Sequence, residues 1–278
     1  MESNKVAKNG KSITLGSGVE ITYCEFGEEH NEVMVMGEFY FHSFVPMMEE
    51  LAKKYHVYGV VMSSRPAELC TEFAADGEID WPYQWGKDIY DFTQAMGLTK
   101  FIYVGKCHGS VPGWCLLEKH PEVLDAFIPI SLPPMDRTPK PLSPERLESL
   151  RLQREDPRTW VANMVRKPEN IEKKLLEMRT INIAGVMGAK HRMPLEYFKT
   201  NEDLFDFFKQ IKVPMMYMTG MDDDGFRSGY EMIAQMGMTI PGIKIVMYYG
   251  ERHFIEMDIP QKLTEDIFLF LKQIGKDC

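Results

Sequence analysis

One cysteine stands in a sequence context that is typical of a catalytic nucleophile. Cys107 is the centre of Gly-Lys-Cys-His-Gly at 105–109, between the apolar run 101–104 and the helix-like segment 114–120. A tight turn from a strand into a helix tolerates only small residues beside the nucleophile, which accounts for the two glycines. The backbone N–H of His108, at the start of the helix, is then available to bind an oxyanion. A thiol in this position can ionise below its ordinary pKa and attack a carbonyl carbon.

A nucleophile of this kind needs a base, and the base needs a carboxylate that orients it. The apolar run 213–219 is followed by the acidic run Asp222-Asp223-Asp224, and the last apolar run, 243–249, is followed by His253. Taken singly, the aspartates indicate a solvated turn and the histidine a surface loop. However, catalytic groups in parallel α/β sheets gather at the carboxyl ends of the strands. Three such groups, each after a separate strand, therefore favour a triad of Cys107, an aspartate of this run and His253.

The elements that must position these residues are predicted from the apolar pattern. The weakly alternating segment 12–26 indicates an antiparallel hairpin at a sheet edge. Buried strands are expected at 33–36, 57–62, 101–104, 126–131, 213–219 and 243–249. Helices are expected at 44–55, 85–96, 114–120, 226–237 and 260–274. This alternation predicts an α/β fold, in which a mostly parallel central sheet carries helices on both faces.

The strand pattern stops between residues 132 and 210. Ser143 and Asp156 each precede a proline, which is the arrangement of a helix N-cap with proline in the first turn. We therefore predict that 132–210 is an inserted helical cap, mobile and lying over Cys107, while 1–131 and 211–278 form the core.

Composition limits the class of protein. The net charge is −9 and no basic run occurs, which argues against nucleic acid and anionic membranes as partners. The first residues are polar, and no stretch is long and apolar enough to span a bilayer. The five cysteines are widely spaced without a Cys-x-x-Cys pair, which indicates a reduced, cytoplasmic protein without structural zinc. The expected partner is a small-molecule acyl substrate, with no metal and no cofactor. A homodimer remains open.

The combined motifs resemble the α/β-hydrolase superfamily from residue 33 to the C-terminus, the insertion excepted. The resemblance implies that Cys107 is the nucleophile, Asp223 the acid and His253 the base. Most members carry serine, and the cysteine is similar to the minority represented by dienelactone hydrolases and acyl-polymerising synthases. The residues that carry the resemblance are the 105–109 motif, His120-Pro121, Val213-Pro214, Gly220-Met-Asp-Asp223, His253-Phe254 and Pro260.

The sequence departs from this pattern after the first central strand. The family's His-Gly pair is replaced by Met36-Gly37, and Glu38 follows. By the resemblance, the backbone N–H groups of Glu38 and His108 form the oxyanion hole. The carboxylate of Glu38 is expected to point away from the hole or to bind a cationic substrate group, because a negative charge in the hole opposes the oxyanion. The side chain of His108 is expected to pack away from the site.

Three functions are consistent with these residues. The first is hydrolysis of an ester, thioester or lactone through a covalent thioester of Cys107. The second is an acyltransferase or cyclase, because a thioester readily passes its acyl group to an acceptor other than water. The third is a ligand-binding protein that keeps the fold without turnover. Activity on generic esters separates the third from the others, and product analysis with added acceptors separates the first two.

Overall fold

The computed structural model describes residues 10–38, 41–62, 67–138, 141–180, 194–223 and 229–277. These residues contain a sheet of eight strands in the order β1-β2-β4-β3-β5-β6-β7-β8. Its strands are β1 (Lys11–Thr14), β2 (Glu20–Phe26), β3 (Val33–Glu38), β4 (His56–Val61), β5 (Phe101–Lys106), β6 (Leu124–Ile130), β7 (Met216–Gly220) and β8 (Lys244–Tyr248). Strand β2 pairs antiparallel with β1 and β4, and all pairs from β4 to β8 are parallel. The predicted class, a mostly parallel α/β sheet, is confirmed.

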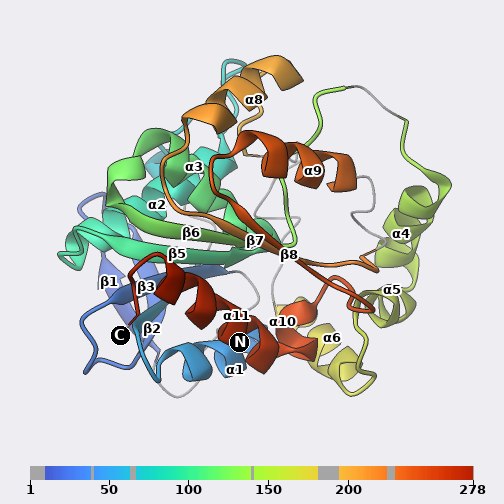
Figure 1. The fold of residues 1–278 in the computed structure, drawn as a ribbon, viewed down its shortest axis with the longest axis horizontal. Helices are drawn as coiled ribbons and strands as arrows, with labels where there is room; N and C mark the ends of the chain where they lie inside the picture. The colour runs from blue at the N-terminus through green and yellow to red at the C-terminus, as the bar shows by residue number, and fades with distance from the viewer. Residues whose placement is uncertain are drawn as a thin grey trace.

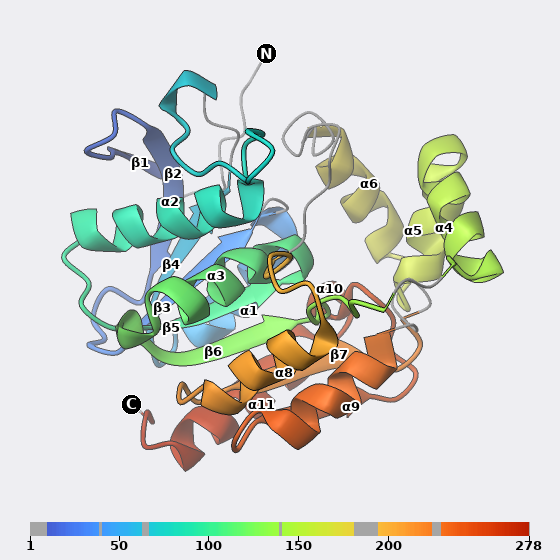
Figure 2. The same cartoon turned by 90° about the horizontal axis from the view of Figure 1, so that it is seen from above.

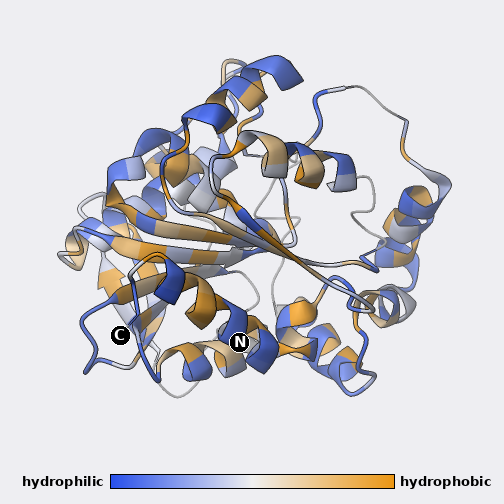
Figure 3. Cartoon of the chain, in the orientation of Figure 1, coloured by the Kyte–Doolittle hydropathy of each residue, from blue (hydrophilic) through white to orange (hydrophobic). Residues whose placement is uncertain are grey.

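Helices cover both faces of this sheet, as predicted (Figure 1). One face carries α1 (Phe41–Leu51) and α11 (Pro260–Gln273). The other carries α2 (Trp81–Ala95), α3 (Val111–Lys119), α8 (Asn201–Gln210) and α9 (Tyr230–Thr239). The sheet separates two apolar cores, and the apolar residues concentrate in the strands and the inner sides of these helices (Figure 3). The sheet is therefore a rigid base for groups at its carboxyl edge.

Between β6 and β7, the regular elements that the structure describes are helices joined by irregular segments. Helices α4 (Pro144–Glu155), α5 (Pro157–Met164) and α6 (Asn170–Thr180) gather beyond one end of the sheet, next to α10 (Ile255–Asp258), in both views (Figures 1 and 2). The two predicted N-caps are confirmed. The side chain of Ser143 accepts a hydrogen bond from the N–H of Arg146, and that of Asp156 accepts one from Thr159.

The last helix of the predicted insertion packs on the core. Leu204 and Phe208 of α8 are fully buried, and the ring of Phe208 lies 6.1 Å from that of Trp114 in α3. The segment 132–210 is thus divided, because α8 covers the sheet whereas α4, α5 and α6 form a separate group. We keep "the insertion" for these three helices. The prediction that 132–210 moves as a cap includes 181–193, which lie outside the described residues.

Two local differences from the sequence prediction have simple causes. Helix α2 begins at Trp81, four residues earlier than expected, because Pro82 occupies its first turn. Helix α3 begins at Val111, three residues earlier than expected, because Pro112 fits in its first turn, where the missing N–H removes no helical hydrogen bond. Across the described ranges, none of the helices combines the length and apolar character that a membrane span requires.

Candidate active site

The predicted nucleophile lies on a sharp turn. Strand β5 ends at Lys106, and a short 3-10 turn, Cys107–Ser110, leads into α3. Cys107 has φ +50°, a left-handed conformation that is rare for a residue with a side chain. A Cβ on Gly105 would lie 2.1 Å from the carbonyl oxygen of Gly109, and one on Gly109 would lie 2.2 Å from that of Gly37. Only glycine fits at these two positions, which is the reason for the motif.

Hydrogen bonds hold this turn in place. The hydroxyl of Ser110 donates to the carbonyl of Cys107 at 2.6 Å, and the buried Tyr103 hydroxyl donates to the carbonyl of Gly109 at 2.8 Å. Cys107 itself is only half-buried, so a substrate carbonyl can reach its sulfur. The strained backbone is therefore stabilised by its neighbours and presents the thiol outward.

The predicted base and acid lie in direct contact. Nδ1 of His253 is 2.7 Å from Oδ2 of Asp223, and both side chains are buried. The imidazole of His253 is also close enough to Cys107 to lower the pKa of its thiol. Because Asp223 engages Nδ1, the second ring nitrogen is the one available to the sulfur. The structure thus brings together the three residues that the sequence singled out, in the order acid, imidazole, thiol.

A glycine at the end of β7 allows the two loops to meet. A Cβ on Gly220 would lie 2.3 Å from the carbonyl oxygen of Arg252 and 2.4 Å from that of Glu251. The N–H of Asp222 donates to the carbonyl of Glu251 at 2.9 Å, which ties the acid loop to the histidine loop. This contact fixes the distance between Asp223 and His253 through the backbone.

The insertion holds the histidine loop from the other side. Asp258, fully buried, accepts hydrogen bonds from the N–H groups of Arg166 at 2.6 Å and Lys167 at 3.1 Å, and from the side-chain amide of Asn170 at 2.8 Å. The N–H of Phe254 donates to the carbonyl of Met164 at 3.0 Å. The turn between α5 and α6 is therefore part of the support of the catalytic loop, a feature that no motif in the sequence indicated.

Buried cations lie beneath the same loop. The ammonium group of Lys106 is 4.0 Å from the ring centre of Phe254, and that of Lys174 in α6 is 4.4 Å from it. Lys106 is 3.6 Å from a carboxylate oxygen of Glu256, and Lys174 donates to Glu177 at 2.9 Å. Each cation thus has a carboxylate partner, as burial requires. The positive charge of Lys106 lowers the pKa of the neighbouring histidines, 108 and 253.

Electrostatics favour an ionised thiol. Burial alone would raise the pKa of Cys107, but the charges of His108 and His253 outweigh it and lower that pKa well below its ordinary value. Burial likewise lowers the pKa of His253, and the carboxylate of Asp223 and the thiolate raise it above its ordinary value. Both shifts favour the ion pair of thiolate and imidazolium over the neutral pair.

One side chain differs from the sequence prediction. His108 does not pack away, since its Nδ1 lies 3.5 Å from the sulfur of Cys107. Glu38 is buried beside the turn, with its Oε2 3.2 Å from where a Cβ on Gly109 would be, and the expectation for its carboxylate stays a prediction. The motif could not reveal the burial of Glu38, because it depends on the close packing of β3 against the turn. The main chain at Glu38 still lies beside the nucleophile, because Gly37 contacts Gly109.

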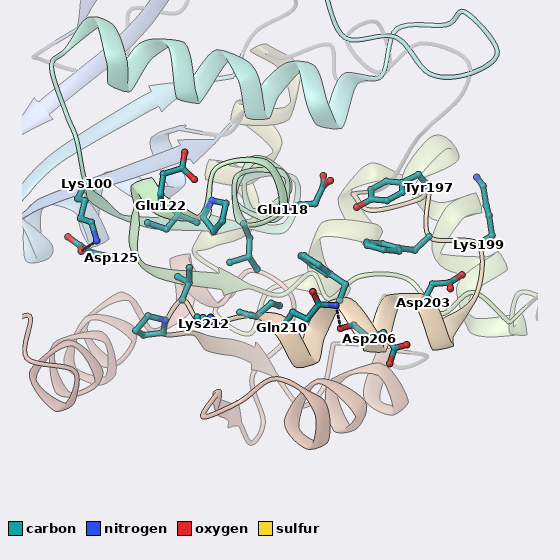
Figure 4. Close-up of a pocket in the computed structure, with 18 residues that line it drawn as sticks. Lys100, Glu118, Glu122, Asp125, Tyr197, Lys199, Asp203, Asp206, Gln210 and Lys212 are labelled. Carbon is teal, nitrogen blue, oxygen red and sulfur yellow. Dashed lines mark hydrogen bonds and ion pairs between the residues drawn. The ribbon is translucent and has the colours of Figure 1, made fainter.

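Other candidate sites are less informative. Among the residues with described positions, no group of three His, Cys, Asp or Glu side chains is arranged to hold a metal ion. A groove of about 1090 Å³ lies on the outer side of the molecule, between α3 and α8 (Figure 4). Its lining, which includes Glu118, Tyr197 and Phe207, shares no residue with the site around Cys107.

The comparisons with known proteins identify the fold. The chain superposes on a membrane phospholipase A described as a bacterial virulence factor (TM-score 0.72, 16% identity, 96% of this chain and 86% of that one). It also matches an esterase from Thermogutta terrifontis (0.68, 19%, 96% and 99%) and an epoxide hydrolase from Vigna radiata (0.66, 16%, 95% and 98%). No protein-family model matches the sequence, and no curated protein matches it significantly. The chain therefore has the α/β-hydrolase fold, and at these identities the likeness concerns the fold alone.

Proposed function

We propose that this chain is a hydrolase of the α/β-hydrolase superfamily that cleaves a carboxylic ester, thioester or lactone through Cys107, His253 and Asp223. The observation that carries the proposal is the continuous contact from Asp223 through His253 to a half-buried thiol on a strained turn. Esterases and a phospholipase among the proteins of this fold are consistent with it. The epoxide hydrolase shows that the fold by itself does not select the reaction.

The arrangement supports a two-step reaction. The thiolate of Cys107 attacks the carbonyl carbon, and the carbonyl π electrons move to oxygen, where the backbone N–H groups of His108 and Glu38 are the proposed donors. The tetrahedral intermediate collapses, the bond to the leaving group breaks, and His253 gives its proton to the departing oxygen or sulfur. A thioester on Cys107 remains.

In the second step, His253 removes a proton from water, and the resulting hydroxide adds to the thioester carbon. Collapse of this intermediate breaks the carbon–sulfur bond, releases the acid and restores the thiolate. Throughout, Asp223 orients the imidazole and stabilises its charged form.

The first test is turnover of p-nitrophenyl acetate and of a simple acyl thioester by the unmodified protein. Cys107→Ala should lose turnover to the level of the uncatalysed reaction, because the other triad members then have nothing to activate. Cys24→Ala is the matched control and should keep full activity, because that thiol is buried in β2. Full activity in Cys107→Ala overturns the proposal, as does the absence of turnover in the unmodified protein, which would favour a binding role.

A second candidate function is acyl transfer, which the cysteine keeps open because a thioester reacts readily with amines and thiols. The discriminating experiment adds an alcohol or an amine to the ester reaction and measures the products. Free acid as the dominant product supports the hydrolase. An ester or amide of the added acceptor as the dominant product replaces it with the transferase.

A further inference from the structure

A second imidazole contacts the proposed nucleophile. Nδ1 of His108 is 3.5 Å from the sulfur of Cys107, within hydrogen-bond reach of a thiol. Both residues are half-buried. His108 comes from the 3-10 turn itself, whereas His253 comes from the loop after β8. The thiol thus has two imidazole partners supplied by independent parts of the chain.

The second imidazole also has a carboxylate near it. Glu38, at the end of β3, is buried next to the turn and acts on His108 through its charge. Burial lowers the pKa of His108, but the thiolate of Cys107 and the carboxylate of Glu38 raise it above its ordinary value overall. Lys106 opposes them with its positive charge. The series Glu38, His108, Cys107 therefore resembles, in charge, the series Asp223, His253, Cys107.

We propose that His108 is a second catalytic imidazole, which holds Cys107 as a thiolate by an ion pair that does not depend on His253. The inference rests on the proposed function, since it concerns the same nucleophile. The two histidines then have separate tasks. His108 keeps the sulfur ionised and holds the proton that leaves the thiol. His253, which carries its own proton before the reaction, gives it to the leaving group and regains one from the attacking water.

Two imidazoles with separate tasks predict a result that a triad with one imidazole does not. In a triad with one imidazole, loss of that imidazole removes both the thiolate and the proton transfer. Here, replacement of His253 should abolish turnover but leave a thiol that still reacts readily with an alkylating agent. Replacement of His108 should weaken alkylation near neutral pH and leave proton transfer by His253 intact.

The groups that face the pair are few within the described residues. His253, with Asp223 behind it, approaches Cys107 from the loop after β8. Lys106 belongs to β5, Glu38 to β3, and the buried Tyr217 of β7 is close enough for the thiolate to raise its pKa. Of these, His108 and His253 are the ones that stabilise the thiolate by charge.

The test measures the rate of alkylation of Cys107 by iodoacetamide as a function of pH, with the modified peptide followed by mass spectrometry. The variants are His108→Gln, His253→Gln and the double variant, and circular dichroism checks that each is folded. We expect each single replacement to raise the midpoint of the alkylation curve by about one pH unit, which reduces alkylation by about tenfold at pH values below both midpoints. The double variant should react like a free thiol, with a midpoint near the ordinary ~8.5.

His120→Gln is the matched control, because His120 stands at the end of α3, where its ring stacks on Tyr90 and its Nδ1 lies 3.4 Å from Glu122. The alkylation curve of this variant should equal that of the unmodified protein. His108→Lys supplies a rescue, since a fixed positive charge should restore part of the low midpoint. An unchanged curve in His108→Gln overturns the inference while the triad, tested by turnover of Cys107→Ala, still stands. Loss of all thiolate in His253→Gln alone overturns it as well.

Discussion

Replacement of Asp258 tests whether the insertion supports the catalytic loop. This carboxylate is fully buried and accepts N–H hydrogen bonds from Arg166, Lys167 and Asn170, all from the α5–α6 turn. Asp258→Asn keeps the size of the side chain and substitutes an NH2 group for one oxygen. Because Oδ2 accepts from Arg166 alone, at 2.6 Å, the new NH2 group in that position faces another donor. If the amide is rotated the other way, its NH2 group faces two donors, Lys167 and Asn170, which bond to Oδ1 in the unmodified protein.

The magnitude follows from these contacts. The variant loses at least one hydrogen bond to a charged group, worth about 1.5–3 kcal/mol, and leaves a buried donor unsatisfied. We expect a loss of about 3 kcal/mol in the free energy of unfolding. With a denaturant dependence of about 3 kcal/mol/M, this lowers the urea midpoint by about 1 M. A displacement of His253 by about 1 Å would reduce kcat by about 10²-fold, with KM little changed.

The assay combines urea unfolding with ester turnover in the absence of urea. Glu265→Gln in α11 is the control, because this exposed carboxylate has only a distant partner, Lys262 at 3.9 Å. Its effect on stability should stay below about 0.5 kcal/mol. Asp258→Asn with a lowered midpoint but an unchanged kcat would refute the idea that this contact positions the histidine. An unchanged urea midpoint would show that the hydrogen bonds of Asp258 do not stabilise the fold by about 3 kcal/mol.

The remaining predictions concern the nucleophile and its surroundings. Gly105→Ala should reduce activity by at least about 10²-fold, because its Cβ would lie 2.1 Å from a backbone carbonyl oxygen and displace the turn, whereas Gly16→Ala meets open space and should be neutral. Equal activity of the two variants would show that the turn is not constrained as described. Glu38→Gln should reduce turnover by less than about tenfold, because its backbone donor remains. A loss of several orders of magnitude would make the carboxylate itself essential to the reaction. Near pH 7, limiting iodoacetamide should label Cys107 first, because the pKa of that thiol is lowered whereas burial raises that of Cys24 to about 12. Labelling of both thiols at similar rates would contradict this electrostatic picture.

The fold and the three main site residues could be predicted because each depends on short-range pattern. The glycines at 105 and 109 and the prolines at 144 and 157 act within a few residues of their positions. The strand ends at Gly220 and Tyr248 lie within one residue of the ends of the apolar runs. In a parallel sheet the carboxyl ends of the strands lie at one edge, so the residues that follow the strands are expected to lie close together.

The burial of Glu38 beside the turn could not be predicted, because it depends on a contact between segments far apart in the sequence. Gly37, next to Glu38, meets Gly109 of the turn backbone to backbone. For the same reason, nothing in the sequence showed that Asp258 binds a turn about ninety residues earlier. The spacing of apolar residues also could not show where α8 packs, because a residue such as Leu204 would be buried either in a cap or in the core.

The central claim is that Cys107 carries the acyl group during the reaction. The most direct measurement is rapid acid quenching of the protein during turnover of a p-nitrophenyl ester, followed by peptide mass spectrometry. The account predicts that the peptide containing Cys107 gains the mass of the acyl group, that hydroxylamine removes it, and that His253→Gln accumulates it, since that variant acylates but cannot activate water. Turnover with no acyl mass on this peptide in either protein, or acyl mass on another residue, would contradict the account.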